Sequence, residues 1–237
     1  MISVVIPAYN EEEYLPLCLE ALAAQTTRET MEVIIVDNNS TDRTQHVAKQ
    51  FSQTLTIRIF EEEMQRRGAA RKNGFSHAQG EIIFSLDADS IPHPQWIERI
   101  LKKFHSDPDI VAVMTSAYIS DCKTSTNILH NIVQPVSLQV CRLYHHHHIL
   151  PGHSFAVRRD AYHMAGGFDS NFDAQEDIEL SNRVAKFGRI VRLHGLPVLM
   201  SGRRFREGFL RGWWDYFSTF SSQFWFKKKK VTLREAK

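Results

Sequence analysis

Short apolar runs rich in β-branched residues alternate with longer, mostly polar segments through the first 120 residues. Five of these runs have the length of β-strands: Ser3–Ile6, Val33–Val36, Ile57–Phe60, Ile82–Leu86 and Val111–Thr115. Four of the five lack strict alternation of apolar and polar residues, which is typical of parallel strands covered on both faces. The sequence between and after them predicts four helices: from about Glu11 to Ala24, after Ser40-Thr41-Asp42, over Ala69–His77 and after Pro92-His93-Pro94. This alternation predicts an α/β fold with a doubly wound, mostly parallel sheet flanked by helices.

Polar residues at two of the strand-to-helix junctions are suited to capping. Asn10 is expected to cap the first helix, and Ser40 or Thr41 the second. In a sheet of this kind, ligands bind beyond the carboxyl ends of the strands. These junctions are therefore the first place to look for functional residues.

The second part of the chain has a less regular pattern. Residues 118–153 show little periodicity and contain the run His145–His148. From Ser154 to Arg192 the sequence predicts a short strand, a turn at Gly166-Gly167 and a helix near Ile178–Phe187. From Arg206 onward, large apolar residues at spacings of three and four predict an amphipathic helix: Leu210, Trp213, Phe217, Phe220 and Phe224. With no repeat or linker, we expect one domain over residues 1–205 and a C-terminal aromatic and basic helical tail over residues 206–237.

Composition is that of a soluble globular protein. The chain has 237 residues, 43% hydrophobic and 24% charged, which allows one large domain with a proper core. No segment approaches the roughly 18 apolar residues of a membrane span, and the N-terminus lacks the basic region of a secretory signal. The three cysteines have no metal-ligand spacing and predict reduced thiols in a cytoplasmic protein: Cys18, Cys122 and Cys141.

Charge is distributed unevenly along the chain. Residues 201–237 contain ten Lys/Arg and three Asp/Glu, whereas residues 1–200 contain nineteen Lys/Arg and twenty-four Asp/Glu. This distribution argues against a nucleic-acid partner for the folded domain and suggests that the tail contacts an anionic partner. An aromatic helix followed by Lys227–Lys230 could lie in a membrane interface, or it could pack on the domain and leave the lysines in water. Both alternatives remain open at this point.

Asp87-Ala88-Asp89 is the strongest candidate for chemistry. It follows the apolar run Ile82–Leu86 directly, which places two carboxylates at the end of a buried strand. Unpaired anionic groups are costly there, and a hard cation such as Mn²⁺ or Mg²⁺ would relieve the cost. Such an ion commonly completes its coordination with diphosphate oxygens. A turn or a helix-capping pair is the alternative.

Four further segments could contribute to a ligand site. Asp37 and Asn38 end the second predicted strand and could bind a nucleobase or ribose. Tyr9 and Glu11, in Pro7-Ala8-Tyr9-Asn10-Glu11, follow the first strand and could do the same.

In Gly68–Gly74, small residues open a helix and Arg71 could meet a phosphate. This segment is not a dinucleotide-binding fingerprint, and no P-loop motif is found. Acidic residues in Gln175–Leu180 favour the start of a helix, and Asp177 could also act as a general base.

Six stretches, in this order, together resemble the glycosyltransferases of family 2, which have the GT-A fold. The matching stretches are Val4–Glu11, Val33–Thr44, Gly68–Gly80, Ile83–Ser90, Pro151–Arg159 with Gly166–Asp169, and Glu176-Asp177. They cover about residues 2–190. The resemblance implies an inverting transfer from a nucleoside-diphosphate sugar, with a donor half of about residues 1–117 and an acceptor half of about residues 118–205.

The resemblance also implies residue roles. Asp89, with Asp87, would bind Mn²⁺ or Mg²⁺, and His194 is a weaker candidate for a third ligand. Asp177 would be the catalytic base, with Gly152, His153 and Glu176 on the acceptor side. The donor nucleotide would be lined by residues from five segments: Pro7, Ala8, Tyr9, Glu11, Asp37, Asn38, Arg71, Asp87, Ala88 and Asp89.

Two departures from the family pattern affect these expectations. Asn38 stands where many members have a second aspartate, so the identity of the base stays open. Ser201–Arg206 replaces the Gln-x-x-Arg-Trp signature of processive members, which argues for a single transfer. The arginines of this stretch could neutralise a diphosphate or lie on the solvated surface.

The acceptor also stays open, between a lipid-linked or membrane-associated glycan and a soluble molecule. We expect a cytoplasmic protein, with possible peripheral contact at the inner face of the membrane through the tail. The run His145–His148 is expected to form an exposed loop near the acceptor pocket. A non-catalytic sugar-nucleotide binding protein and a nucleotidyltransferase are the alternative functions.

Overall fold

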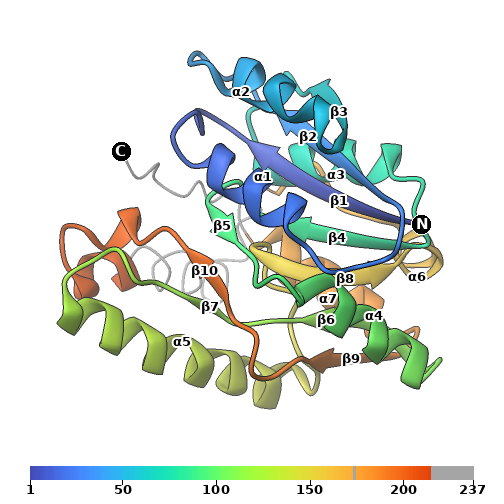
Figure 1. Cartoon of the computed structure of the whole chain (residues 1–237). Coiled ribbons are helices and arrows are strands. Elements are labelled where there is room, and N and C mark those ends of the chain that lie inside the picture. Colours follow the sequence, from blue (N-terminus) through green and yellow to red (C-terminus); the bar gives the residue numbers. More distant parts are fainter. Residues whose placement is uncertain (173–174, 215–237) are drawn as a thin grey trace.

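The computed structural model describes residues 1–172 and 175–214. Its centre is a seven-stranded sheet in the order β3-β2-β1-β4-β8-β6-β9 (Figure 1). The strands are β1 Ile2–Ala8, β2 Met31–Asp37, β3 Thr56–Glu61, β4 Ile82–Leu86, β6 Ile110–Met114, β8 Ser154–Arg158 and β9 Arg189–Arg192. Only β8 runs antiparallel to its neighbours, β4 and β6. The doubly wound, mostly parallel α/β fold and all five predicted strands are confirmed.

Helices cover both faces of this sheet. Side chains alternate along β1, so Val4 and Ile6 enter one core with α1 and α4, whereas Val5 enters the other with α3, α6 and α7. The described helices are α1 Leu15–Ala23, α2 Thr44–Gln50, α3 Arg67–His77, α4 Trp96–Ser106, α5 Thr124–His145, α6 Arg159–Met164 and α7 Glu176–Val184, with short 3-10 turns at η1 Phe51–Gln53 and η2 Arg203–Phe205.

A second, smaller sheet ties the two parts of the chain together. It has the order β5-β10-β7, formed by β5 Ser90–Ile91, β10 Val198–Met200 and β7 Ala117–Tyr118. Ser201 N–H, just after β10, donates to Asp89 O at 3.1 Å. This sheet therefore brings the segment around residue 203 against the loop that follows β4.

The expected helix caps were wrong. α1 begins at Leu15, with Pro16 in its first turn, rather than near Glu11. Asn10 adopts a left-handed φ of 52°, and its Oδ1 accepts from Thr41 N–H at 2.8 Å, so it joins two loops instead of capping a helix. α2 begins at Thr44, whose N–H donates to Asp42 Oδ1 at 2.9 Å.

The main element that sequence analysis missed is α5, a helix of 22 residues within the stretch that showed little periodicity. His145 is its last residue, and His146–His148 form a loop as expected, but only His146 of the run is exposed.

Residues 209–214 begin the helix predicted after Arg206. Phe217, Phe220, Phe224 and Lys227–Lys230 lie outside the described residues, so the proposed tail is described only at its start. Within the described part of the chain, no helix has the length and apolar character needed to cross a bilayer.

Candidate active site

Most of the predicted site residues lie at one edge of the main sheet, where β1, β2 and β4 end. Asp37 is the last residue of β2, and Asp87 follows β4 directly. β8 runs the opposite way, so its beginning lies at this same edge, next to Gly152 and His153. The first turn of α7 adds Glu176 and Asp177.

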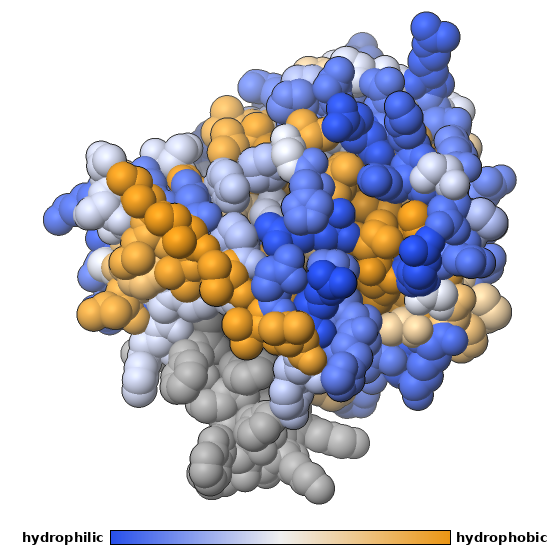
Figure 2. Space-filling model, turned by 90° about the horizontal axis from the view of Figure 1, so that it is seen from below, coloured by the Kyte–Doolittle hydropathy of each residue, from blue (hydrophilic) through white to orange (hydrophobic). Residues whose placement is uncertain are grey.

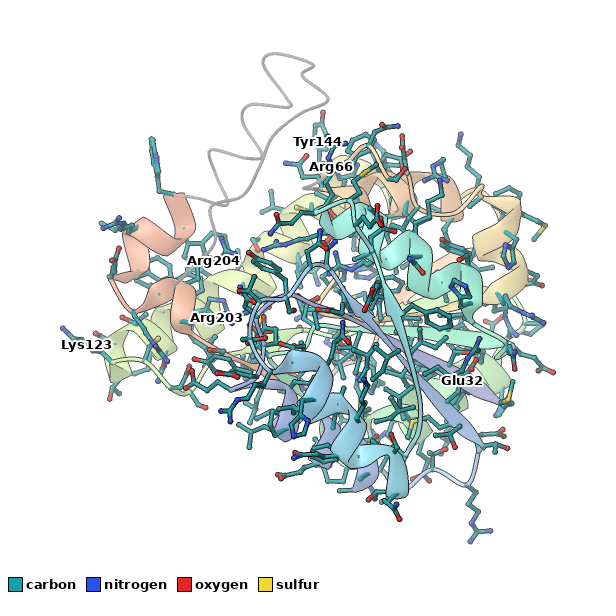
Figure 3. All side chains as sticks on the ribbon, turned by 90° about the horizontal axis from the view of Figure 1, so that it is seen from above. Glu32, Arg66, Lys123, Tyr144, Arg203 and Arg204 are labelled. Atoms are coloured by element: carbon teal, nitrogen blue, oxygen red, sulfur yellow. The ribbon has the colours of Figure 1, made fainter. Side chains whose placement is uncertain are left out.

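Arg203 contacts a first cluster of carboxylates, formed by Glu11 and Asp89. It forms two hydrogen bonds with Glu11, one of them from Nη1 to Oε2 at 3.0 Å, and its Nη2 lies 3.2 Å from Asp89 Oδ2. Burial raises the pKa of Asp89 to about 7, and the charges of Asp87 and Glu11 add to this, so Arg203 compensates only part of the negative charge. Burial likewise raises the pKa of Glu11. Arg203 and Arg204, the first two residues of the turn η2, are labelled in Figure 3.

Arg71 contacts a second cluster of carboxylates, formed by Asp87 and Glu176. This arginine of α3 is 3% exposed, and its guanidinium donates to Asp87 Oδ1 at 2.7 Å and to Glu176 Oε1. Burial alone would raise the pKa of Asp87, but the charges of Arg71 and Arg67 lower it. Burial raises the pKa of Glu176 to about 7. One buried arginine thus joins the loop after β4 to the start of α7.

Gly152 gives the Arg71 side chain its space. A Cβ at this position would lie 2.4 Å from Arg71 Nη2, so any other residue here would displace the Arg71 guanidinium from its present place. The N–H of Gly152 donates to Asp177 Oδ2 at 3.0 Å. The glycine therefore admits the arginine and positions the carboxylate at the same time.

Asp177 is partly buried in the first turn of α7. Its Oδ1 accepts from Ile178 N–H at 2.8 Å, so both carboxylate oxygens are held by backbone donors. Burial raises its pKa above the ordinary value for aspartate, against the opposing effects of Arg71 and these two donors. A carboxylate that is held in place and has a raised pKa is suited to accept a proton.

His153 lies close enough to Asp87 and Arg71 to interact with their charges. Burial lowers its pKa to about 4, so the ring is neutral near pH 7. Its Nε2 is buried without a hydrogen-bond partner in the described structure. The ring therefore adds no positive charge to compensate the carboxylates at neutral pH.

The polar side chains at the end of β2 form hydrogen bonds within the protein. Asp37 Oδ2 accepts from Gln45 Nε2 at 2.6 Å. Asn38 is buried, and its amide donates to the carbonyl oxygens of Glu62 and Met64, each at 2.8 Å. Only the amide oxygen of Asn38 is left to meet a ligand.

The remaining predicted residues form the walls of the edge or lie apart from it. Pro7 and Ala8 belong to β1, Tyr9 follows it partly buried, and Ala88 is buried between the two aspartates. His194 is exposed after β9, and among the described residues it forms no metal-site group with Asp87 and Asp89. Among the residues that the structure describes, no group of three or more His, Cys, Asp or Glu has the arrangement of a metal site.

Sequence analysis left the role of Arg203 open and missed Arg67 in this site. Arg203 is separated from Glu11 by 192 residues, and no local pattern signals such a pair. Arg67, the first residue of α3, acts on Asp87, Asp89 and Glu176 through its charge. The sequence did contain a sign of this role, because Arg67 stands one helical turn before Arg71 and carries the same charge.

Comparison with known proteins identifies similar sequences. The family described as Glycosyl transferase family 2 matches residues 3–164. Glycosyltransferase AglE of Haloferax volcanii is 45% identical over 102 residues, which are 41% of this chain and 33% of that protein. Probable glycosyltransferase YdaM of Bacillus subtilis is 28% identical over 203 residues, which are 81% of this chain and 48% of that protein. The chain thus spans less than half the length of these relatives.

Solved structures share the fold. TarS of S. aureus in complex with UDP superimposes with a TM-score of 0.70 at 18% identity, covering 84% of this chain and 60% of that one. Mannosyltransferase PcManGT of Pyrobaculum calidifontis, in complex with GDP-Man and Mn²⁺, gives a TM-score of 0.64 at 21% identity, covering 92% and 64%. At these identities the likeness concerns the fold, and it confirms the expected GT-A architecture.

Proposed function

This chain belongs to glycosyl transferase family 2, and we propose that it transfers a sugar from a nucleoside-diphosphate sugar to an acceptor hydroxyl or phosphate, once per encounter and with inversion. One observation carries the proposal. At the carboxyl edge of the sheet, Arg71 and Arg203 contact four carboxylates and leave negative charge uncompensated; the four belong to Glu11, Asp87, Asp89 and Glu176.

We propose that this charge holds a divalent cation on Asp89 and Asp87. Carboxylate oxygens are the ligands that Mn²⁺ and Mg²⁺ prefer, and burial raises the pKa of Asp89 to about 7, so a further positive charge would favour its ionised form. The Mn²⁺ in the PcManGT complex supports this assignment. When bound, the ion would stabilise the departing diphosphate.

We propose that residues 1–117 form the donor half. Tyr9 stacks on the base, with Pro7 and Ala8 beneath it, and Glu11 and Asp37 meet the ribose. Asn38 offers its carbonyl oxygen, because its amide hydrogens are engaged. Arg71 already binds two carboxylates, so we now assign it the positioning of Asp87 and Glu176 ahead of direct contact with phosphate.

In the acceptor half, residues 118–205, we propose Asp177 as the catalytic base. The backbone N–H groups of Gly152 and Ile178 orient its carboxylate, which accepts the acceptor's proton. The acceptor oxygen then bonds to the anomeric carbon as the bond from that carbon to the diphosphate oxygen breaks. Glu176, held by Arg71, and neutral His153 line the acceptor side.

The alternative functions differ in what they require. A nucleotidyltransferase would place a Gly-rich loop with a basic residue after β1, whereas this chain has Pro7-Ala8-Tyr9-Asn10. A binding protein without turnover would not need the oriented carboxylate of Asp177. We also propose that the protein works in the cytoplasm, with its tail in peripheral contact with a membrane.

Thermal unfolding with a panel of UDP-, GDP-, dTDP- and CDP-sugars, with and without Mn²⁺, tests the donor site. A ligand at a hundred times its Kd stabilises the folded protein by about 2.7 kcal/mol, which gives a clear rise in Tm. We expect such a rise with one nucleotide and only with metal. No rise with any donor, with Mn²⁺ present, would overturn the assignment of Asp87 and Asp89.

A further inference from the structure

The outer surface of α5 is apolar along most of its length. Between Asn127 and Tyr144, every exposed position except Arg142 carries a large apolar side chain. These residues are 42–76% exposed: Ile128, Leu129, Ile132, Val136, Val140, Leu143 and Tyr144. Figure 2, which views the molecule from below, shows apolar side chains gathered in a continuous band. We call these seven residues the α5 face.

The pattern of α5 is the reverse of that of an ordinary surface helix. α4 buries its large apolar residues, among them Trp96, Ile100 and Phe104, and this is the arrangement that water favours. The buried positions of α5 include the polar residues Thr126, His130 and Gln134. Apolar residues outside and polar residues inside indicate that the α5 face meets a medium other than water.

The charges around the α5 face indicate which medium. α5 has no Asp or Glu in its 22 residues. The exposed cations Lys123 and Arg142 lie at its beginning and near its end, and Tyr144, an amphipathic aromatic residue, lies at the second end. Lys123 and Tyr144 are labelled in Figure 3. Cations and a tyrosine at the ends of an aliphatic stripe are typical of a helix that lies in the headgroup region of an anionic membrane.

The chain that adjoins α5 has the same character. Rings of Phe205 and Trp213 contact the ring of His130, at centroid distances of 4.8 and 6.3 Å, so the segment before the tail packs beside this helix. Leu210 and Trp214 in this segment are 82% and 66% exposed. The sequence after Trp214 continues with aromatic residues and Lys227–Lys230.

We propose that the α5 face docks on the surface of a bilayer that contains anionic phospholipid, with the helix axis parallel to the surface and Lys123 and Arg142 at the phosphates. A second copy of the chain or the chain's own tail are the competing occupants. Neither accounts for cations at both ends of a stripe that has no acidic residue. The docking involves no step of glycosyl transfer, so it can be tested apart from the proposed function.

Flotation of the full chain with vesicles tests the proposal. We expect binding to phosphatidylcholine vesicles that contain 30% phosphatidylglycerol, and much weaker binding to pure phosphatidylcholine or at high salt. The double substitution Ile132→Glu and Val136→Glu should lower the partition coefficient at least about tenfold. Both positions are exposed, at 60% and 56%, so the core is left intact.

The matched control is Met164→Glu with Phe187→Glu, which adds the same charge at two exposed apolar positions on α6 and beyond α7. The control should bind like the unaltered chain, and Tm values should show that both variants are folded. Hydrogen exchange of the unaltered chain gives a second measurement, since α5 amides should gain protection when vesicles are added.

Two outcomes would overturn the proposal. One is unchanged vesicle binding by the α5 variant, which would assign any binding to the tail. The other is a dimer that the same substitutions convert to a monomer, in a chain that does not bind vesicles. Light scattering after gel filtration detects the second case.

Discussion

Buried carboxylates at the two edges of the central sheet have pKa values shifted in opposite directions. At the amino edge, Glu32 is 5% exposed and accepts from Ser3 Oγ at 2.6 Å, Gln79 N–H at 2.7 Å and Arg58 Nη1 at 2.8 Å. Burial alone would raise its pKa, but these donors lower it. At the carboxyl edge, burial raises the pKa of Asp89 and of Glu176 to about 7. Figure 3 shows Glu32 far from Arg203.

The difference separates a structural group from a functional one. Glu32 has all the partners it needs within the chain, so it stabilises the folded state. Asp89 and Glu176 at the other edge are compensated only in part, which lowers stability and leaves a site whose missing partner is a ligand. Neutralising Glu32 at one edge and Asp89 at the other should therefore have opposite effects on stability and unequal effects on activity.

The largest effect is expected for Asp177→Asn. Loss of a general base commonly lowers the rate about 10²–10⁴-fold, whereas the donor site at Asp87 and Asp89 is left in place. Sugar transfer should fall by that factor while the donor-dependent rise in Tm is kept, as measured by product formation and thermal unfolding on the same sample. Transfer at the unaltered rate would exclude Asp177 as the base.

Arg71→Met should have the next largest effect. It leaves Asp87 and Glu176 without their shared partner in a buried place, which typically costs about 3–5 kcal/mol. Urea unfolding should show a lower midpoint with little change in slope. An unaltered midpoint would mean that the arginine does not hold the two carboxylates together in solution.

Glu32→Gln should destabilise the protein by about 1–3 kcal/mol, because an amide donor would then face Arg58 and the N–H of Gln79. Transfer per folded molecule should stay unchanged. A loss of transfer without a loss of stability would contradict the contrast between the two edges.

The pH dependence of Glu32→Gln sharpens this test. The folded pKa of Glu32 is lowered, so its carboxylate stabilises the folded state above the unfolded pKa, and this contribution is lost as the pH falls through the folded pKa. The stability difference between the unaltered chain and the variant should therefore be full at neutral pH and shrink in acid. Unfolding in urea at several pH values measures it.

Asp89→Asn should have the smallest effect on stability, and in the opposite direction. It removes a buried charge that Arg203 compensates only in part, so without added metal at neutral pH the variant should gain about 0.5–2 kcal/mol. The Mn²⁺-dependent rise in Tm with donor should disappear. If the variant were less stable than the unaltered chain, the ion pair with Arg203 would fully offset the cost of burying the Asp89 carboxylate, and the expectation would be wrong.

The sequence predicted the first part of the fold well because its physical signals are local. Ile82–Leu86 is apolar except for Ser85, and the structure assigns the same bounds to β4. α5 escaped prediction because its buried positions include polar residues, and because Pro135 lies inside it, where a proline ordinarily argues against a helix. The usual assumption that apolar residues face inward does not apply to such an element.

The candidate site was predictable in part for a similar reason. Asp37, Asp87 and Asp89 lie at strand ends that periodicity locates, and parallel strands bring those ends together. The contacts of Arg203 with Glu11 and Asp89 depend on the small sheet formed by β5, β7 and β10, whose strands have two or three residues each and leave no periodic signal.

The position of β8 sets an order for folding during synthesis. β1 to β4 are complete once residue 86 has been made, and each already has its parallel neighbours among them. β6 lies two places from β4, and among the described strands it pairs only with β8 and β9, so it has no partner among them until residues 154–158 emerge. Until then the open edge of β4 and the strand β6 can pair with other chains. Ribosome-bound chains that end between Met114 and Ser154 are therefore the ones that should depend most on chaperones.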